Sequence, residues 1–290
     1  MRFGVVYPQT ELGGDPQAVH DIGVGCEALG FDHLVVYDHV VGAEHADREP
    51  ALWGPYTEHD PFHDPFVMFG YLAAVTSRIE LATGVLILPQ RQTVLVAQQA
   101  ADADLLTRER IRLGVGTGWN YVEYQALGQD FSTRGARLDE QIGLLRRLWS
   151  DPLVTFDGRF DRVERGCINP RPRRSIPVWV GGFSEPAFRR GGVLGDGFTF
   201  AGDVDRAIEG LARVRHHLAE SGRPADGFGL ELIPTRARDT ATAIEAAERW
   251  QSAGGTHTAF VTLKLGLDTA AAHLDYLQSL HSALSARFGQ

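Results

Sequence analysis

The chain has 290 residues, of which 43% are hydrophobic and 22% charged, and its formal net charge is -9. This composition suits a globular protein with a large buried core. Nucleic-acid binding requires clustered basic side chains, and the nearest approach to a cluster is Arg171, Arg173 and Arg174 in a proline-rich stretch. Nucleic acid is therefore disfavoured as a partner. No apolar run reaches 18 residues, which disfavours a membrane partner as well.

The two cysteines, Cys26 and Cys167, lie far apart and lack metal-ligand spacing, so we expect free thiols in a reducing compartment. The first residues resemble a strand ended by Pro8 rather than a charged leader, and we expect a cytoplasmic protein.

Short β-branched runs alternate along the chain with longer amphipathic segments. We expect strands over 3–7, 33–37, 79–88, 111–115, 178–180, 197–201, 229–233 and 258–263. We expect helices over 16–29, 65–76, 93–106, 134–149, 185–194, 205–221, 240–253 and 269–288. Eight strand–helix units predict a (β/α)8 TIM barrel, an α/β fold, as one domain over residues 1–290. An open doubly wound sheet is the competing fold, but the glycine fingerprint that it normally carries is absent after the first strand.

Two connections are longer than an ordinary loop of this fold: an insertion after strand two, residues 40–64, and one after helix four, residues 151–176. The first, here called the lid loop, follows a strand end on the face where barrel active sites form. We expect it to act as a lid and substrate wall, with possible contacts from Trp53, Tyr56, His59, Phe62 and His63. The alternative is a loop that only packs over the barrel. In the second insertion, residues 156–160 predict a hairpin turn.

The third strand is broken near its middle by Thr83 and Gly84. A glycine inside a strand marks a bulge or a place where a ligand approaches the backbone closely. Relief of crowding inside the barrel is the other explanation.

Other strand ends carry candidate site residues. Strand two ends in Asp38 and His39, and His39 is the best titratable group at the rim because histidine exchanges protons near neutrality. Strand four ends in Gly116, Gly118 and Trp119, where small residues leave room for a flat ring and the indole can close one side. Strand five ends in four residues that lead into a helix N-terminus suited to a phosphate: Gly181, Gly182, Phe183 and Ser184.

The histidines show no metal-ligand spacing, and neither a Gly-x-Ser-x-Gly elbow nor a Cys–His arrangement is present. We expect no metal. A barrel without its own nucleophile or metal usually relies on a cofactor.

Taken together, these motifs resemble the bacterial luciferase-like superfamily, and especially its F420-dependent oxidoreductases. The resemblance rests on residues 30–32, 38–39, 82–85 with Pro89, 112–119, 131–140 and 177–182. It implies a cofactor at the C-terminal face of the barrel. Family members that use F420 have a non-prolyl cis peptide in strand three behind the ring, and Gly84-Val85 occupies that place here.

The resemblance further implies that the cofactor contacts Asp38, Thr83, Gly84, Val85, Gly116, Gly118, Trp119, Gly181, Gly182, Phe183 and Ser184, with His39 as the catalytic residue. One departure is Trp119, which stands where the family's sugar-phosphate dehydrogenases have a glutamate acid. Glu123 and Tyr124 are weaker alternatives for proton handling.

The resemblance thus suggests an oxidoreductase that transfers a hydride between C5 of F420 and a small organic substrate. One alternative is an FMN-dependent luciferase-like monooxygenase that uses O2 and a separate reductase. Another is a non-catalytic ligand-binding barrel. Members of the family usually form dimers through helices beside strands two and three, so the resemblance implies a homodimer. The apolar 94–106 segment suits that interface.

Overall fold

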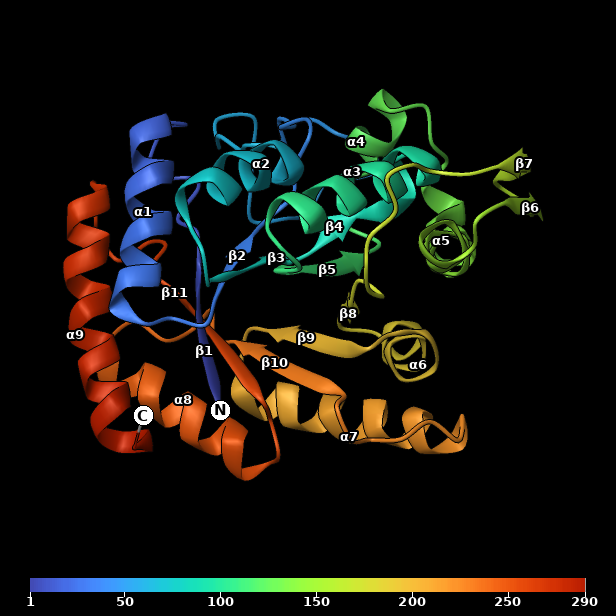
Figure 1. Ribbon diagram of the computed structural model, residues 1–290. Helices are drawn as coiled ribbons and strands as arrows, with labels where there is room; N and C mark the ends of the chain where they lie inside the picture. Colours follow the sequence, from blue (N-terminus) through green and yellow to red (C-terminus); the bar gives the residue numbers. More distant parts are fainter. Residues whose placement is uncertain (290) are drawn as a thin grey trace.

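Runs of buried aliphatic and aromatic residues form a closed parallel sheet in the computed structural model, which describes residues 1–289. Within these residues the sheet has nine strand segments: β1 (Arg2–Val6), β2 (His33–Val36), β3 (Glu80–Thr83), β4 (Leu86–Ile87), β5 (Ile111–Gly116), β8 (Val178–Gly181), β9 (Gly197–Ala201), β10 (Gly229–Ile233) and β11 (His257–Val261). Strand β1 pairs with β2 and β11, and β3 pairs with both β2 and β5, which closes the sheet (Figure 1). The segments β3 and β4 form one broken barrel strand, so the predicted (β/α)8 barrel is confirmed.

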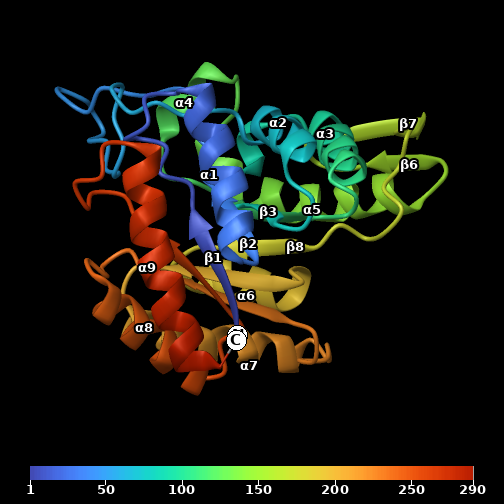
Figure 2. The ribbon, with the colours of Figure 1, turned by 60° about the vertical axis from the view of Figure 1, so that its left-hand side comes forward.

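Helices surround the barrel, and α1 and α9 lie side by side on its outer surface (Figure 2). The α-helices are α1 (Pro16–Leu29), α2 (Pro65–Val75), α3 (Thr93–Leu106), α4 (Tyr121–Ala126), α5 (Arg134–Ser150), α6 (Glu185–Leu194), α7 (Val204–Glu220), α8 (Thr240–Ser252) and α9 (Ala270–Phe288), and two short 3-10 turns are η1 (Leu88–Gln90) and η2 (Phe131–Thr133), all within residues 1–289. None of the helices in this part of the chain combines the length and the apolar character needed to cross a bilayer.

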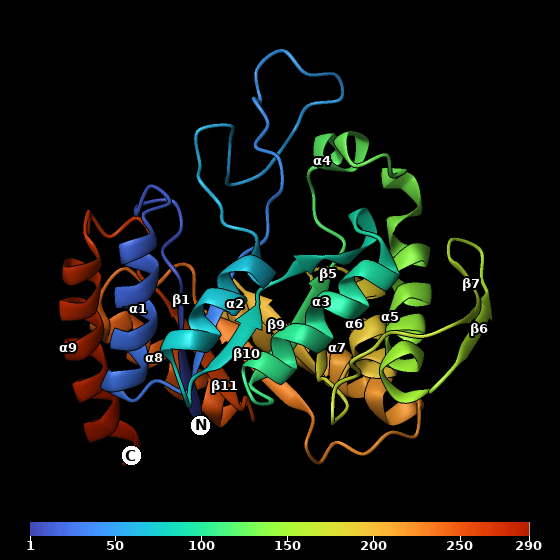
Figure 3. The same ribbon diagram turned by 45° about the horizontal axis from the view of Figure 1, so that its top comes forward.

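Both predicted insertions are present. The lid loop rises above the C-terminal ends of the strands, next to α4 (Figure 3). The second insertion contains an antiparallel hairpin of β6 (Val154–Asp157) and β7 (Arg162–Gly166) beside α5, which confirms the turn expected over residues 156–160. The strands of this hairpin and the short helix α4 were not predicted.

A layer of charged side chains fills the barrel near the N-terminal ends of its strands. The Glu231 carboxylate accepts hydrogen bonds from Arg112 at 3.0 and 3.1 Å, and its Oε1 lies 2.7 Å from Nε2 of His33. The Arg112 guanidinium also lies 4.0 Å from the centre of the Trp179 ring. Burial opposes the charge of Glu231, but Arg112 and His33 hold its pKa well below the usual range. Because this layer closes the lower end of the barrel, the upper end is left for a functional site.

Candidate active site

His39 lies at the C-terminal mouth of the barrel among aromatic side chains. Its ring centre is 5.1 Å from that of Tyr56, 4.7 Å from Phe62 and 5.6 Å from Trp119. Its side chain is only 11% exposed, and its Nδ1 lies 3.2 Å from Oε1 of Glu123. The mouth therefore brings together a titratable group and an apolar wall that limits its access to water.

The lid loop supplies part of this wall, but fewer residues than the sequence suggested. Tyr56 and Phe62 face His39, as expected for contacts at the site. Trp53 is 81% exposed and the His59 side chain 85% exposed, so the expectation that these two line the site is wrong for this structure. His63 lies beside Gly14, near the first strand's loop.

The break in the third barrel strand contains a cis peptide between Gly84 and Val85, as the resemblance implied. The Val85 side chain fits between two glycines of neighbouring strands. A Cβ atom on Gly116 would lie 2.5 Å from Cγ2 of Val85, and one on Gly181 would lie 2.7 Å from Cγ1. Contacts this close do not occur, so Val85 requires glycine at both positions. Sequence reasoning linked these glycines to a ligand and missed this packing role.

Thr83 and Asp38 hold the broken strand in place. The Thr83 hydroxyl donates to the Gly114 carbonyl at 2.6 Å. The Asp38 carboxylate accepts from the Ile87 N–H at 2.9 Å and from Arg91 at 2.6 Å. Burial raises the pKa of the Asp38 carboxyl, and Arg91 opposes that shift. These contacts give Asp38 a structural task, and a direct contact between Asp38 and a cofactor stays a prediction.

Arg91 extends this support to the lid loop. It also donates to Asp64 at 3.0 Å, and the Asp64 side chain caps the N-terminus of α2. The guanidinium thus connects the strand end that carries Asp38 to the residue where the lid loop ends.

The end of β5 forms one side of the mouth. Gly118 has φ of 63°, a left-handed conformation that favours glycine, and a Cβ there would lie 2.9 Å from Ile87. The following Trp119 packs beneath the lid loop, where a Cβ on Gly54 would come within 2.3 Å of its ring. Trp119 therefore lies between His39 and the loop backbone.

The end of β8 leads into α6 through Gly181, Gly182, Phe183 and Ser184. Ser184 is the N-cap of α6, but its side chain makes no capping hydrogen bond. Pro186 has no N–H and the Ala187 N–H donates to the Ser184 carbonyl at 2.9 Å, so in the first turn the Glu185 N–H is the one available to an anion such as phosphate. Phe183 is 67% exposed beside them.

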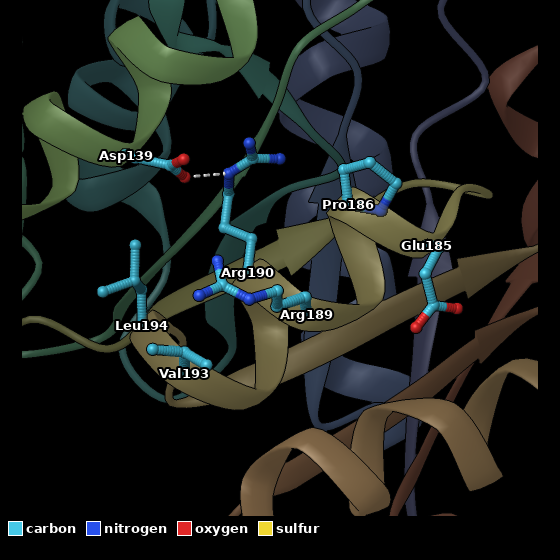
Figure 4. Close-up of a pocket in the computed structure, with 7 residues that line it drawn as sticks. All are labelled: Asp139, Glu185, Pro186, Arg189, Arg190, Val193 and Leu194. Carbon is cyan, nitrogen blue, oxygen red and sulfur yellow. Dashed lines mark hydrogen bonds and ion pairs between the residues drawn. The ribbon is translucent and has the colours of Figure 1, made fainter. Parts of the chain in front are cut away.

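A surface hollow of about 500 Å³ lies along α6 and α5 (Figure 4). Arg190, one of the residues that line it, pairs with Asp139, and Arg189 lines it together with Val193 and Leu194. The hollow shares no residue with the cluster around His39.

We place the candidate active site at the barrel mouth, because the titratable group, the strand break and the aromatic wall converge there. Among residues 1–289, no group of three or more His, Cys, Asp or Glu residues is arranged to hold a metal ion.

A closed parallel barrel with these groups at its C-terminal mouth defines a TIM-barrel protein with a candidate ligand site built on strand ends. The chain belongs to the luciferase-like monooxygenase family, whose model matches residues 1–286. It is 32% identical over 215 residues to an uncharacterized protein of Mycobacterium tuberculosis, covering 71% of this chain and 73% of the relative.

A second relative has a functional name. The F420-dependent glucose-6-phosphate dehydrogenase of Intrasporangium calvum is 32% identical over 249 residues, which cover 81% of this chain and 70% of that protein. Among solved structures, an F420-dependent secondary alcohol dehydrogenase in complex with an F420–acetone adduct superposes with a TM-score of 0.77. That match has 15% sequence identity and covers 97% of this chain and 98% of the other, and it confirms the fold.

Proposed function

We propose that this protein is an F420-dependent oxidoreductase that transfers a hydride between C5 of the deazaflavin and a small organic substrate beneath the lid loop. The observation that carries the proposal is the break between β3 and β4, where Val85 fits against Gly116 and Gly181 at the mouth of the barrel that also holds His39. Family membership and the F420-dependent relative support the choice of cofactor.

The residues at the mouth fit such a cofactor. Thr83, Gly84 and Val85 would support the ring from behind, while Gly116, Gly118 and Trp119 would line its side. The segment that leads into α6 would hold the phosphate through Gly181, Gly182, Phe183 and Ser184, since the Ser184 side chain makes no capping hydrogen bond to the helix. When bound, F420 supplies a carbon that accepts or donates a hydride.

His39 would move the proton that accompanies this transfer. Its Nδ1 faces Glu123, which leaves Nε2 as the ring nitrogen that would exchange a proton with a substrate oxygen. Tyr56 and Phe62 would exclude water from that exchange. Trp119 occupies the place where the family's sugar-phosphate dehydrogenases have an acid, so we propose a substrate other than a sugar phosphate.

A cofactor titration tests the proposal. Purified protein titrated separately with F420 and FMN is expected to bind F420 and not FMN, as measured by calorimetry. Trp119→Ala should weaken F420 binding, whereas Trp53→Ala should not, because Trp53 lies on the same side of the barrel but faces solvent. Binding of FMN alone would instead indicate a luciferase-like monooxygenase that uses O2 and a separate reductase. Binding of neither would indicate a ligand-binding barrel without redox chemistry.

We also propose that two copies of the chain pair through the outer faces of α2 and α3. These neighbouring helices expose Val67, Tyr71, Leu95 and Leu106, and α2 is apolar all around. A helix with no polar face is normally covered. Light scattering should report a dimer for the wild type and a monomer for Val67→Asp, while Leu153→Asp, outside this face, should stay dimeric. A monomeric wild type would refute this pairing.

A further inference from the structure

We infer that Glu123 is a positioning residue that fixes which nitrogen of His39 carries the proton and that also fastens the lid loop to the barrel. The inference concerns the residues around His39 and deepens the proposed function, in which His39 handles the proton.

A single carboxylate oxygen of Glu123 makes all the relevant contacts. Its Oε1 accepts from the N–H groups of Val40 at 2.7 Å and Val41 at 3.1 Å, and lies 3.2 Å from Nδ1 of His39. The Glu123 side chain is 2% exposed, so water does not compete for these bonds. The first two residues of the lid loop and the candidate catalytic residue therefore share one acceptor.

The neighbours of Glu123 hold the same loop at further points. Asn120 donates from its side chain to the Val41 carbonyl at 3.3 Å. The Tyr121 hydroxyl donates to the Pro50 carbonyl at 2.7 Å. Together with the packing of Trp119 against Gly54, these contacts attach the beginning and the middle of the lid loop to α4 and the segment before it.

This arrangement fixes the tautomer of His39. An oxygen that already accepts two main-chain N–H groups has no hydrogen to give, so Nδ1 of the imidazole must be the donor. In the neutral ring the lone pair then lies on Nε2, which can take a proton from a substrate hydroxyl. The carboxylate also stabilises the positive charge that the ring acquires in that step, as a third group does when it orients a catalytic histidine.

The test uses cofactor-free protein and needs no substrate. Nitrogen-15 NMR of the imidazole, recorded above the pH at which the ring protonates, should show the Nδ1–H form of His39 as the major one in the wild type. Glu123→Ala removes the acceptor and should lose that form in favour of Nε2–H. The same variant should increase amide hydrogen exchange of Val40 and Val41 at least tenfold, since each loses a buried partner.

Two further variants separate positioning from general stability. Glu123→Gln keeps an acceptor oxygen and should retain both the tautomer and the amide protection. Glu58→Ala changes an acidic residue of the lid loop whose partner is the exposed His59, and it should alter neither. A merely structural role for Glu123 would leave the tautomer in place.

The inference is overturned if wild-type His39 is mainly Nε2–H, or if Glu123→Ala keeps the wild-type tautomer. Loss of both properties in Glu123→Gln would also contradict it, because an acceptor oxygen would then not be what matters. If Glu123→Ala fails to fold, the wild-type spectrum and the Glu123→Gln variant still decide. A correct tautomer result together with no F420 binding would reject the proposed cofactor and leave this inference standing.

Discussion

Replacing Glu231 by glutamine should destabilise the barrel strongly, since this carboxylate organises the charged layer below the site. Its two oxygens take four contacts: Arg112 twice, His33 at 2.7 Å and Thr199 at 3.1 Å. Glutamine keeps one acceptor oxygen, so about two of these contacts are lost and an amide N–H group faces donors. Hydrogen bonds to charged groups contribute about 1.5 to 3 kcal/mol each, and breaking a buried ion pair costs about 3 to 5 kcal/mol. We expect a loss of about 3 to 5 kcal/mol in the free energy of unfolding.

The assay is urea unfolding at pH 7, with thermal melting as a second measure. For a chain of this size the loss corresponds to a fall in Tm of roughly 5 to 8 °C. Glu80→Gln is the matched control, because Glu80 also bonds Arg112, at 2.7 Å, but its side chain is 21% exposed. The control should cost about 1 kcal/mol. Equal losses in the two variants, or a Glu231→Gln protein as stable as the wild type, would refute this account of the layer.

Three further predictions concern packing, pH and the base of the lid loop. Gly116→Ala should reduce stability by about 1 to 3 kcal/mol in chemical unfolding because its Cβ would collide with Val85, and adding Val85→Ala should recover most of the loss. Burial, with Arg112 nearby, lowers the pKa of His257 to about 3, so below pH 6.5, the ordinary pKa of histidine, the unfolded chain binds more protons than the folded one, and the free energy of unfolding should fall as pH drops from about 6.5 toward 3. His257→Gln should flatten that dependence in unfolding curves recorded across this range. An unchanged slope would contradict this account. Arg91→Met leaves Asp38 buried without its cation and should cost about 3 to 5 kcal/mol, whereas a loss below 1 kcal/mol in the same assay would show that the ion pair is not what holds this strand end.

The barrel could be predicted from sequence because each barrel strand is a local pattern of buried residues followed by an amphipathic helix. Helix α1 begins at Pro16 and ends at Leu29, the bounds expected, because a proline in the first turn and a left-handed Gly30 at the C-cap are local signals. Helix α4 was missed since six residues are too few to show a helical period. The strands β6 and β7 were missed because they are largely exposed, so their sequences lack the continuous apolar face that predicts a strand.

The site was predictable only where its signal is local. His39 closely follows a strand, and Gly84 interrupts one, so both could be located from the sequence together with the family resemblance. The contact between His39 and Glu123 joins residues 84 positions apart, and no spacing rule connects them. The fit of Val85 between Gly116 and Gly181 likewise depends on how three strands align, which only the closed sheet determines.

The attachment of the lid loop to α4 has a consequence for redesign. A loop transplanted from a relative would arrive without the acceptor that Glu123 offers to Val40 and Val41, and without the contact from Tyr121 to Pro50. The loop and α4 therefore constitute one exchangeable module, although about sixty residues of sequence separate them. Altering the substrate range of this barrel by chimeragenesis would require both pieces to come from the same parent.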